Sequence, residues 1–221
     1  MNAQKNQRKM IKMNRVSMFI TFEGTEGSGK TTQSELLTKA LREKGFEVLH
    51  TYEPGGTKIS DKIRQILLDP ENSNMSPLTE LFLYLSARAQ HIEEVIKPAL
   101  AAGKIVICDR FIDATMAYQG YGRGLNKDLI QKLNAVVTQE LKPDLTFVLD
   151  VDPQEGLEMA KTLSTAGLGD RIEQEALDFH QRVRQGYLEI SKQESARVKI
   201  INRQKSVEEI HQIILNLCSG I

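Results

Sequence analysis

A glycine-rich run at residues 24–31 has the residue types and spacing of a phosphate-binding loop. It reads Gly-Thr-Glu-Gly-Ser-Gly-Lys-Thr and fits the pattern GxxxxGK[ST]. Glycines let backbone N–H groups converge on an anion, and the following helix N-terminus adds partial positive charge. We expect Lys30 to bind the β- and γ-phosphates of a nucleoside triphosphate, and the Thr31 hydroxyl to reach Mg²⁺. The loop predicts nucleotide binding but not the fate of the phosphate.

A charged pair closes an apolar run farther along the chain. Residues 105–108 are Ile-Val-Ile-Cys, and Asp109 and Arg110 follow directly. Ligands of open α/β sheets bind at the carboxyl ends of strands. Asp109 is therefore a candidate for binding Mg²⁺ or its waters, and Arg110 for binding phosphates. The alternative is a structural ion pair at a strand end.

Further polar and aromatic residues are spaced as a second binding site would require. Glu53 begins a Glu-Pro-Gly-Gly sequence at the end of a predicted strand, and Arg64 lies on the next predicted helix. Tyr84 and Arg88 are one helical turn apart. Three more candidates follow the charged pair, namely Thr115, Tyr118 and Gln119. Taken singly, each has an ordinary structural explanation as a turn, a surface cation or a packing aromatic.

The elements that position these residues alternate short β-rich runs with longer amphipathic stretches, which is typical of a parallel α/β sheet. Predicted strands cover residues 18–23, 47–53, 105–109, 145–150 and 198–201. Predicted helices cover residues 30–43, 60–68, 77–102, 127–140, 153–162, 172–192 and 207–217. The helix over 77–102 places apolar residues on one face that we interpret as core: Leu78, Leu81, Phe82, Leu85, Ala89, Ile92, Ile96 and Ala99. Glycine-rich segments at 120–124 and 164–170 are expected to be mobile or tightly turned.

The composition is ordinary for a globular protein of 221 residues, with 40% apolar and 26% charged residues. No run approaches the roughly 18 to 20 apolar residues of a membrane span, and we expect no secretory signal. The two cysteines form no Cys-x-x-Cys motif, which favours a reduced, cytoplasmic location. The four histidines are scattered, so we predict no transition-metal site.

The formal net charge is zero, but residues 1–17 contain five basic residues and no acidic one: Lys5, Arg8, Lys9, Lys12 and Arg15. One interpretation is a nucleic-acid or membrane contact. We favour a disordered extension, or an early start codon followed by Met10, Met13 and Met18, because a short basic run without aromatics is a weak nucleic-acid footprint. We expect no nucleic-acid or membrane partner.

Phosphate-binding loops serve kinases, GTPases and motor ATPases alike, so the fold does not decide the function. A GTPase needs an Asn-Lys-x-Asp sequence for guanine, and Asn126-Lys127-Asp128 has the acid one place early. A motor ATPase normally needs a longer chain and an oligomeric sensor arginine. A small-molecule kinase needs a second, cationic site facing the γ-phosphate, which the residues above supply.

Together these residues closely resemble bacterial thymidylate kinases from about residue 18 to the C-terminus. The landmarks are residues 22–32, 53–56, 84–88, 109–110, 117–124, 143–146, 149–153 and 170–173. The block Ala-Tyr-Gln-Gly-Tyr-Gly-Arg-Gly at 117–124, together with Glu-Pro-Gly-Gly, is the most specific part. The resemblance implies an α/β P-loop NTPase-type fold like that of nucleoside monophosphate kinases. It would be a single domain over residues 18–221, with a five-stranded parallel sheet and a mobile lid near 161–171.

The implied activity is phosphorylation of thymidine monophosphate (dTMP) to dTDP with ATP and Mg²⁺, a step in dTTP biosynthesis, by a homodimer. The residues implied to bind the ATP phosphates are Gly24, Thr25, Glu26, Gly27, Ser28, Gly29, Lys30 and Thr31. Those implied to bind dTMP are Glu26, Glu53, Arg64, Tyr84, Arg88, Arg110, Thr115, Tyr118 and Gln119. Thr31 and Asp109 are the candidates for Mg²⁺, and the catalytic candidates are Lys30, Arg110, Arg171 and Lys161.

The resemblance also assigns individual roles at the acceptor. Glu26 contacts the sugar 3′-hydroxyl, Arg64 and Arg110 hold the acceptor phosphate, and Tyr118 lies below the deoxyribose. Tyr84 replaces a phenylalanine that usually stacks on thymine. Arg88 donates to thymine O4, where cytosine has an amine donor instead.

The sequence departs from the family pattern at two places besides the N-terminal tail. Tyr52 stands where an arginine commonly precedes Glu-Pro-Gly-Gly. The lid offers only Lys161 and Arg171, whereas many relatives carry several arginines there. We expect Arg171, assisted by Lys161, to close over the γ-phosphate. The alternatives to a dTMP kinase are another nucleoside or nucleotide kinase of this fold, or a non-catalytic nucleotide-binding regulatory protein.

Overall fold

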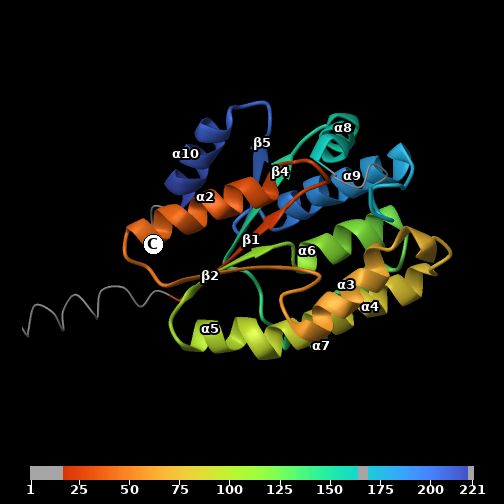
Figure 1. Cartoon of the computed structure of the whole chain (residues 1–221), viewed down its shortest axis with the longest axis horizontal. Coiled ribbons are helices and arrows are strands. Elements are labelled where there is room, and N and C mark those ends of the chain that lie inside the picture. Colours follow the sequence, from red (N-terminus) through yellow and green to blue (C-terminus); the bar gives the residue numbers. More distant parts are fainter. Residues whose placement is uncertain (1–16, 164–168, 219–221) are drawn as a thin grey trace, which may run out of the picture.

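The computed structural model describes residues 17–163 and 169–218, so the predictions for residues 1–16 and for the segment 164–168 lie outside it. Five parallel strands form one sheet in the order β2-β3-β1-β4-β5 (Figure 1). The strands are β1 (Met18–Glu23), β2 (Val48–Tyr52), β3 (Ile105–Asp109), β4 (Leu145–Asp150) and β5 (Val198–Asn202). The predicted fold class is confirmed.

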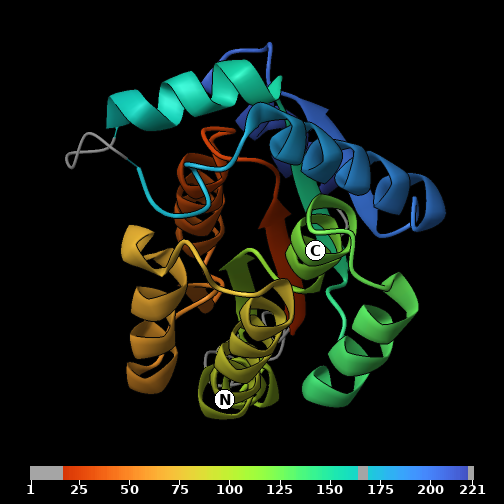
Figure 2. The ribbon, with the colours of Figure 1, turned by 90° about the vertical axis from the view of Figure 1, so that its right-hand side faces the viewer.

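Helices connect the strands and cover both faces of the sheet (Figures 1 and 2). The α-helices are α2 (Lys30–Glu43), α3 (Lys58–Leu68), α4 (Pro77–His91), α5 (Lys97–Ala101), α6 (Ile112–Thr115), α7 (Lys127–Thr138), α8 (Pro153–Leu163), α9 (Leu177–Gln193) and α10 (Val207–Leu217). A 3-10 turn, η1 (Pro70–Asn72), and two π-helical segments, η2 (Ile92–Ile96) and η3 (Met116–Gly122), complete the described elements. None of these helices is long and apolar enough to cross a membrane.

The core has two layers because alternate residues of each strand face opposite sides of the sheet. On one side, Ile105 and Ile107 pack in a cluster with Leu37 of α2 and Ile210 of α10. On the other side, the intervening Val106 joins a cluster with residues of η2 and α5, and α9 packs over β4 and β5. Figure 1 shows α2 and α10 together on one side of the sheet.

The helix predicted over residues 77–102 is interrupted, and its predicted core face is partly wrong. The π-helical segment η2 separates α4 from α5, and its wider turn shifts the helical phase. Leu81 and Leu85 are buried as expected, whereas Leu78 and Phe82 are 46% and 49% exposed. The apolar pattern therefore spans two faces of α4, and only one of them reaches the core.

The glycine-rich segment at 120–124 was interpreted as mobile or tight, and the structure shows close packing. Residues 112–122 form α6 and η3, which no prediction included. A Cβ atom on Gly122 would lie 2.6 Å from the ring of Phe179, so this glycine lets α9 approach η3. The predicted helix over 172–192 begins only at Leu177, because residues 171–175 form turns.

The sheet brings three strand ends to one edge. Tyr52 of β2 and Phe22 of β1 both lie in register with Asp109, the last residue of β3. After β1 the chain continues to β2, on one side of β1 in the sheet. After β3 it crosses to β4, on the other side of β1. The carboxyl end of β1 is therefore a topological switch point, where open α/β sheets bind ligands.

Candidate active site

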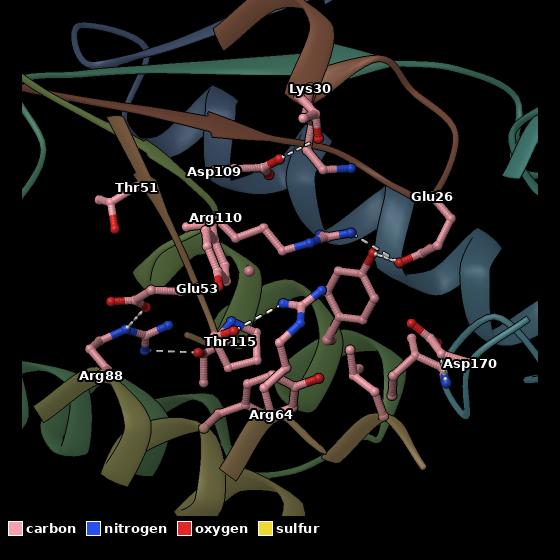
Figure 3. Close-up of a pocket in the computed structure, with 18 of the residues that line it drawn as sticks. Glu26, Lys30, Thr51, Glu53, Arg64, Arg88, Asp109, Arg110, Thr115 and Asp170 are labelled. Atoms are coloured by element: carbon pink, nitrogen blue, oxygen red, sulfur yellow. Dashed lines mark hydrogen bonds and ion pairs between the residues drawn. The ribbon is translucent and has the colours of Figure 1, made fainter. Parts of the chain in front are cut away.

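A cavity of about 750 Å³ opens at this edge of the sheet (Figure 3). Figure 3 shows Lys30 and Asp109 at one end, Arg64 and Arg88 at the other, and Arg110 between them. Thirteen predicted site residues line it, drawn from the loop after β1, the ends of β2 and β3, helices α3 and α4, and segments α6 and η3: Glu26, Gly27, Lys30, Thr31, Glu53, Arg64, Tyr84, Arg88, Asp109, Arg110, Thr115, Tyr118 and Gln119.

The phosphate-binding loop begins directly after β1 and ends at the first turn of α2. Gly24, Gly27 and Gly29 all have positive φ angles, a conformation that residues with a Cβ atom rarely adopt. The loop also packs against α8, because a Cβ on Gly27 would lie only 2.0 Å from the carbonyl oxygen of Gly156. Glycine is therefore required both by the loop conformation and by the neighbouring helix.

Lys30 is folded over the loop that it follows. Its Nζ donates to the Thr25 carbonyl at 2.8 Å and to the Ser28 hydroxyl at 3.3 Å. Burial, together with the positive charge of Arg110, lowers the pKa of Lys30 to about 8. An anionic ligand in the loop would stabilise the charged ammonium of Lys30, because its negative charge would replace the water that burial excludes.

The two predicted Mg²⁺ ligands are in direct contact. The Thr31 hydroxyl donates to Oδ2 of Asp109 at 2.8 Å, at the phosphate-loop end of the cavity. Mg²⁺ in nucleotide enzymes is typically held by a few protein oxygens, by phosphate oxygens and by waters. One hydroxyl and one carboxylate beside the loop fit that ion.

Glu26 and Arg110 form a buried ion pair at the centre of the site. Arg110 Nη2 lies 3.0 Å from Glu26 Oε1, which also accepts from the Tyr118 hydroxyl at 2.6 Å. The other oxygen of Glu26 lies 3.2 Å from Nδ1 of His180. Burial disfavours the carboxylate, but the His180 contact and the charge of Arg110 outweigh it and lower the pKa of Glu26 to about 2. Glu26 is thus an acceptor of hydrogen bonds at neutral pH.

Arg110 itself is held in an unusual backbone conformation. Its φ angle is +70°, in the left-handed region that non-glycine residues seldom occupy. Its backbone N–H donates to the Phe22 carbonyl at 2.9 Å, and Nη1 donates to the Gly24 carbonyl at 3.0 Å. The turn after β3 thereby points the guanidinium toward the phosphate loop.

Arg88 is buried and donates to four protein groups. Nε donates to Glu53 at 2.8 Å and Nη2 donates to the Phe111 carbonyl at 2.9 Å. Nη1 donates to the Thr115 hydroxyl at 2.9 Å and to Asn134 at 2.8 Å. These contacts occupy four of its five N–H groups, so the second N–H of Nη2 is the donor left for a base. Glu53 and Thr115 therefore orient Arg88 as well as line the cavity.

Tyr52, which replaces the usual arginine, contacts another arginine of the site. The Arg64 guanidinium lies 5.4 Å from the centre of the Tyr52 ring and donates to the Pro54 carbonyl at 2.9 Å. The Tyr52 hydroxyl donates to Asp61 at 3.0 Å. The tyrosine ring thus helps to hold the Arg64 guanidinium at the end of the cavity opposite Lys30.

The two predicted lid cations lie away from the cavity lining in this conformation. Arg171 is 4% exposed; its Nε donates to the Leu67 carbonyl at 2.7 Å, and Nη2 lies 2.7 Å from a carboxylate oxygen of Glu80. Lys161 is an exposed residue of α8. For Arg171 to contact a γ-phosphate, a buried ion pair would have to break. Its predicted catalytic role has no geometric support here and stays a prediction.

Sequence reasoning missed three buried titratable residues around the site. Glu23, the last residue of β1, accepts from the Phe111 N–H at 2.7 Å, and burial with the negative charge of Asp113 raises its pKa to about 8. Glu80 interrupts an apolar helix face, and His180 lies beside the buried Phe179. An acidic residue directly before a phosphate loop, and a charge inside an apolar stripe, were the available signals.

Comparisons with known proteins show which family the chain belongs to. The thymidylate kinase family model matches residues 22–214. The chain is 55% identical over 206 residues to the thymidylate kinase of Geotalea daltonii, covering 91% of this chain and 96% of that protein. It is 52% identical over 200 residues to the thymidylate kinase of Pelobacter propionicus, covering 89% and 91%.

A solved structure is similar as well. The crystal structure of thymidylate kinase from Ehrlichia chaffeensis superposes with a TM-score of 0.74 at 38% sequence identity. The match covers 92% of this chain and 99% of that one. On fold, site and sequence together, the chain belongs to the thymidylate kinase family of nucleoside monophosphate kinases.

Proposed function

We propose that this protein transfers the γ-phosphate of ATP·Mg²⁺ to dTMP, and that the two anions meet inside the cavity described above. The observation that carries the proposal is the arrangement of cations in one cavity. Lys30 lies with the phosphate loop at one end, Arg64 and Arg88 lie at the other, and Arg110 lies between them.

At the donor end, main-chain amides of residues 24–31 and Lys30 hold the ATP phosphates. Thr31 and Asp109 would hold Mg²⁺, and the ion would supply positive charge that neutralises the transferring phosphate. Lys30 exchanges its contacts with Thr25 and Ser28 for phosphate oxygens.

At the acceptor end, Arg64 and Arg110 bind the phosphate of dTMP, and Glu26 accepts from the sugar 3′-hydroxyl. The base stacks on Tyr84 while Arg88, Thr115 and Gln119 contact its polar edge; Tyr118 lies beneath the sugar. Glu53 holds Arg88 in place.

The chemistry requires positioning and charge neutralisation more than proton transfer. The acceptor phosphate is already an anionic nucleophile at neutral pH. Arg110 can bridge the two ends, since it is bonded to the Gly24 carbonyl at the start of the phosphate loop and to Glu26. No general base is needed.

The lid supplies two further cations. We keep Lys161 and Arg171 as candidates for stabilising the transferring phosphate. Separate Lys161→Ala and Arg171→Ala enzymes would be compared in kcat and in thermal stability. A fall in kcat without a fall in stability supports a catalytic role; unchanged kcat removes the residue from the mechanism.

We further propose a homodimer in the cytoplasm. Four large apolar side chains are about half exposed on the neighbouring helices α3 and α4, which suits an interface between copies: Ile59, Ile66, Leu78 and Phe82. Both cysteines are free and buried, which suits a reducing compartment. Light scattering of the wild type and of a Phe82→Glu variant tests the dimer; an unchanged molar mass would remove this interface.

A coupled assay of ADP release with ATP, Mg²⁺ and a panel of acceptors tests the activity. We expect turnover with dTMP to exceed that with dUMP, dCMP, AMP or thymidine. ADP release that does not depend on dTMP would indicate ATP hydrolysis, and no ADP release would leave a nucleotide-binding protein; either result would contradict the proposal. Omission of Mg²⁺ should abolish turnover.

A further inference from the structure

Glu80 of α4 is fully buried and accepts contacts from three side chains. Its Oε1 accepts from the amide nitrogen of Gln119 at 2.8 Å and from Arg123 Nε at 3.1 Å. Its Oε2 accepts from Arg123 Nη2 at 2.9 Å and lies 2.7 Å from Arg171 Nη2. The proposed mechanism does not use Glu80, yet one of its partners lines the acceptor end of the cavity.

The charge of Glu80 determines which way the Gln119 amide faces. Burial disfavours the carboxylate, but the hydrogen bonds from Arg123 and Gln119 and the charges of both arginines lower its pKa. An ionised carboxylate only accepts hydrogen bonds, so the atom of Gln119 that faces it must be the NH₂ group. The carbonyl Oε1 of Gln119 then faces the other way. It makes no hydrogen bond to any residue that the structure describes, and Gln119 lines the cavity.

A carbonyl oxygen presented to a pyrimidine edge can distinguish the bases. Thymine and uracil carry an N–H donor at position 3, whereas the ring nitrogen of cytosine is an acceptor there. An acceptor fixed in the cavity pairs with the former and leaves two unpaired acceptors with the latter. A freely rotating amide would instead offer its NH₂ group to cytosine and lose the distinction.

We propose that Glu80, held by Arg123 and Arg171, is a positioning residue that fixes the amide orientation of Gln119 and thereby selects dTMP over dCMP. This inference rests on the proposed function, which places the acceptor's base beside Gln119. It also gives Arg171 a role, because its guanidinium helps to keep the Glu80 carboxylate charged and in place.

The test is the ratio of kcat/KM for dTMP to kcat/KM for dCMP. Glu80→Gln keeps the side-chain size, but its amide can donate as well as accept hydrogen bonds. The Gln119 amide can then rotate and present either its NH₂ group or its carbonyl oxygen to the cavity. We expect the ratio to fall about 10- to 100-fold, mostly through lost dTMP turnover, with KM for ATP unchanged. Both substrates are measured on one preparation, so the folded fraction cancels. If Glu80→Gln is insoluble, Glu80→Asp is measured instead. Its shorter side chain keeps the negative charge but moves the carboxylate away from Gln119, so the same fall in the ratio is expected.

Two comparisons separate positioning from general damage. Glu175→Gln removes the other carboxylate on Arg123, 2.6 Å from its Nη2, without touching Gln119, and should leave the ratio unchanged. In a Gln119→Leu background, Glu80→Gln should produce no further change in the ratio. A wild-type ratio in Glu80→Gln, or an equal fall in the Gln119→Leu background, would overturn the inference. Absence of dTMP turnover in the wild type would instead overturn the proposed function.

Discussion

The two ends of the cavity are built in different ways. At the donor end, four residues of one continuous eight-residue loop line the cavity: Glu26, Gly27, Lys30 and Thr31. At the acceptor end, side chains from several elements meet, and most of them are hydrogen-bonded to other parts of the protein. Arg88 alone joins α4 to Glu53, Thr115, Asn134 and the Phe111 carbonyl.

At the donor end, ligand binding and protein stability therefore depend on different contacts. At the acceptor end they depend on the same contacts. Lys30 contacts only its own loop, so removing its charge should alter chemistry alone. Acceptor-end residues are also the polar contacts that hold helices on the sheet. Their removal should alter both chemistry and stability.

The largest expected effect is on catalysis at the donor end. Lys30→Met should lower kcat about 10³-fold, because one fixed cation near the transferring phosphate is lost. Its melting temperature should be unchanged or higher, since a buried amine with a lowered pKa is removed. Steady-state kinetics and a thermal melt check both. Lys39→Met, an exposed position on the same helix, is the control; a Lys30→Met enzyme that melts well below it would break the comparison.

The acceptor end should respond differently. Arg88→Ala should lower kcat/KM for dTMP about 10²-fold and also destabilise the fold by about 3 kcal/mol, because the buried Glu53 loses its arginine partner and keeps the contact with His91. Urea unfolding and kinetics measure the two effects. Arg64→Ala sharpens the point: Arg64 has one backbone hydrogen bond, so dTMP binding should weaken with much less loss of stability. Equal stability of the two variants would contradict the contrast.

The donor end also depends on a distant residue of the chain, Gly156 of α8. A Cβ there would lie 2.4 Å from the Glu26 carbonyl oxygen, so either α8 or the loop must move. Gly156→Ala should raise KM for ATP, lower kcat/KM about tenfold, and lower the melting temperature. In an unobstructed helix the same change would stabilise by about 1 kcal/mol. The sign of the stability change therefore decides between the two outcomes. A stabilised enzyme with an unchanged KM for ATP would show that α8 and the loop can move apart at little energetic cost.

The same contrast explains which parts of the fold and of the site could be predicted from the sequence. The loop at 24–31, the strand β1 and the helix α2 were predicted to the residue, because glycine spacing and periodicity are local. Residue types and local spacing made the acceptor residues candidates, but their individual roles came from the family resemblance, since no spacing along the chain relates Arg88 to Glu53. Segment η3 was missed because its helical form depends on packing against α9, and Leu78 was assigned to the core because periodicity cannot say which of two apolar faces is covered.

The smallest expected effect concerns Glu23, where the two ends join. Its carboxyl accepts from the Phe111 N–H and lies 2.8 Å from the Tyr187 hydroxyl. Its pKa rises from 4.5 to about 8 in the folded protein, through burial and the charge of Asp113. The folded state therefore keeps a proton that the unfolded chain loses above pH 4.5. The stability from this proton is full below that pH and is lost as pH rises through about 8.

Glu23→Gln copies the protonated side chain, with an amide that can donate to Tyr187 where the acid would carry its proton. The melting temperature of the wild type should fall between about pH 5 and pH 8.5, and that of the variant should fall by less. Glu43→Gln, at an exposed position on α2, should follow the wild type. Parallel curves for all three proteins would mean that Glu23 is ionised at neutral pH. The carboxylate before the loop would then add negative charge where the phosphates bind, and Arg110 would have to offset it.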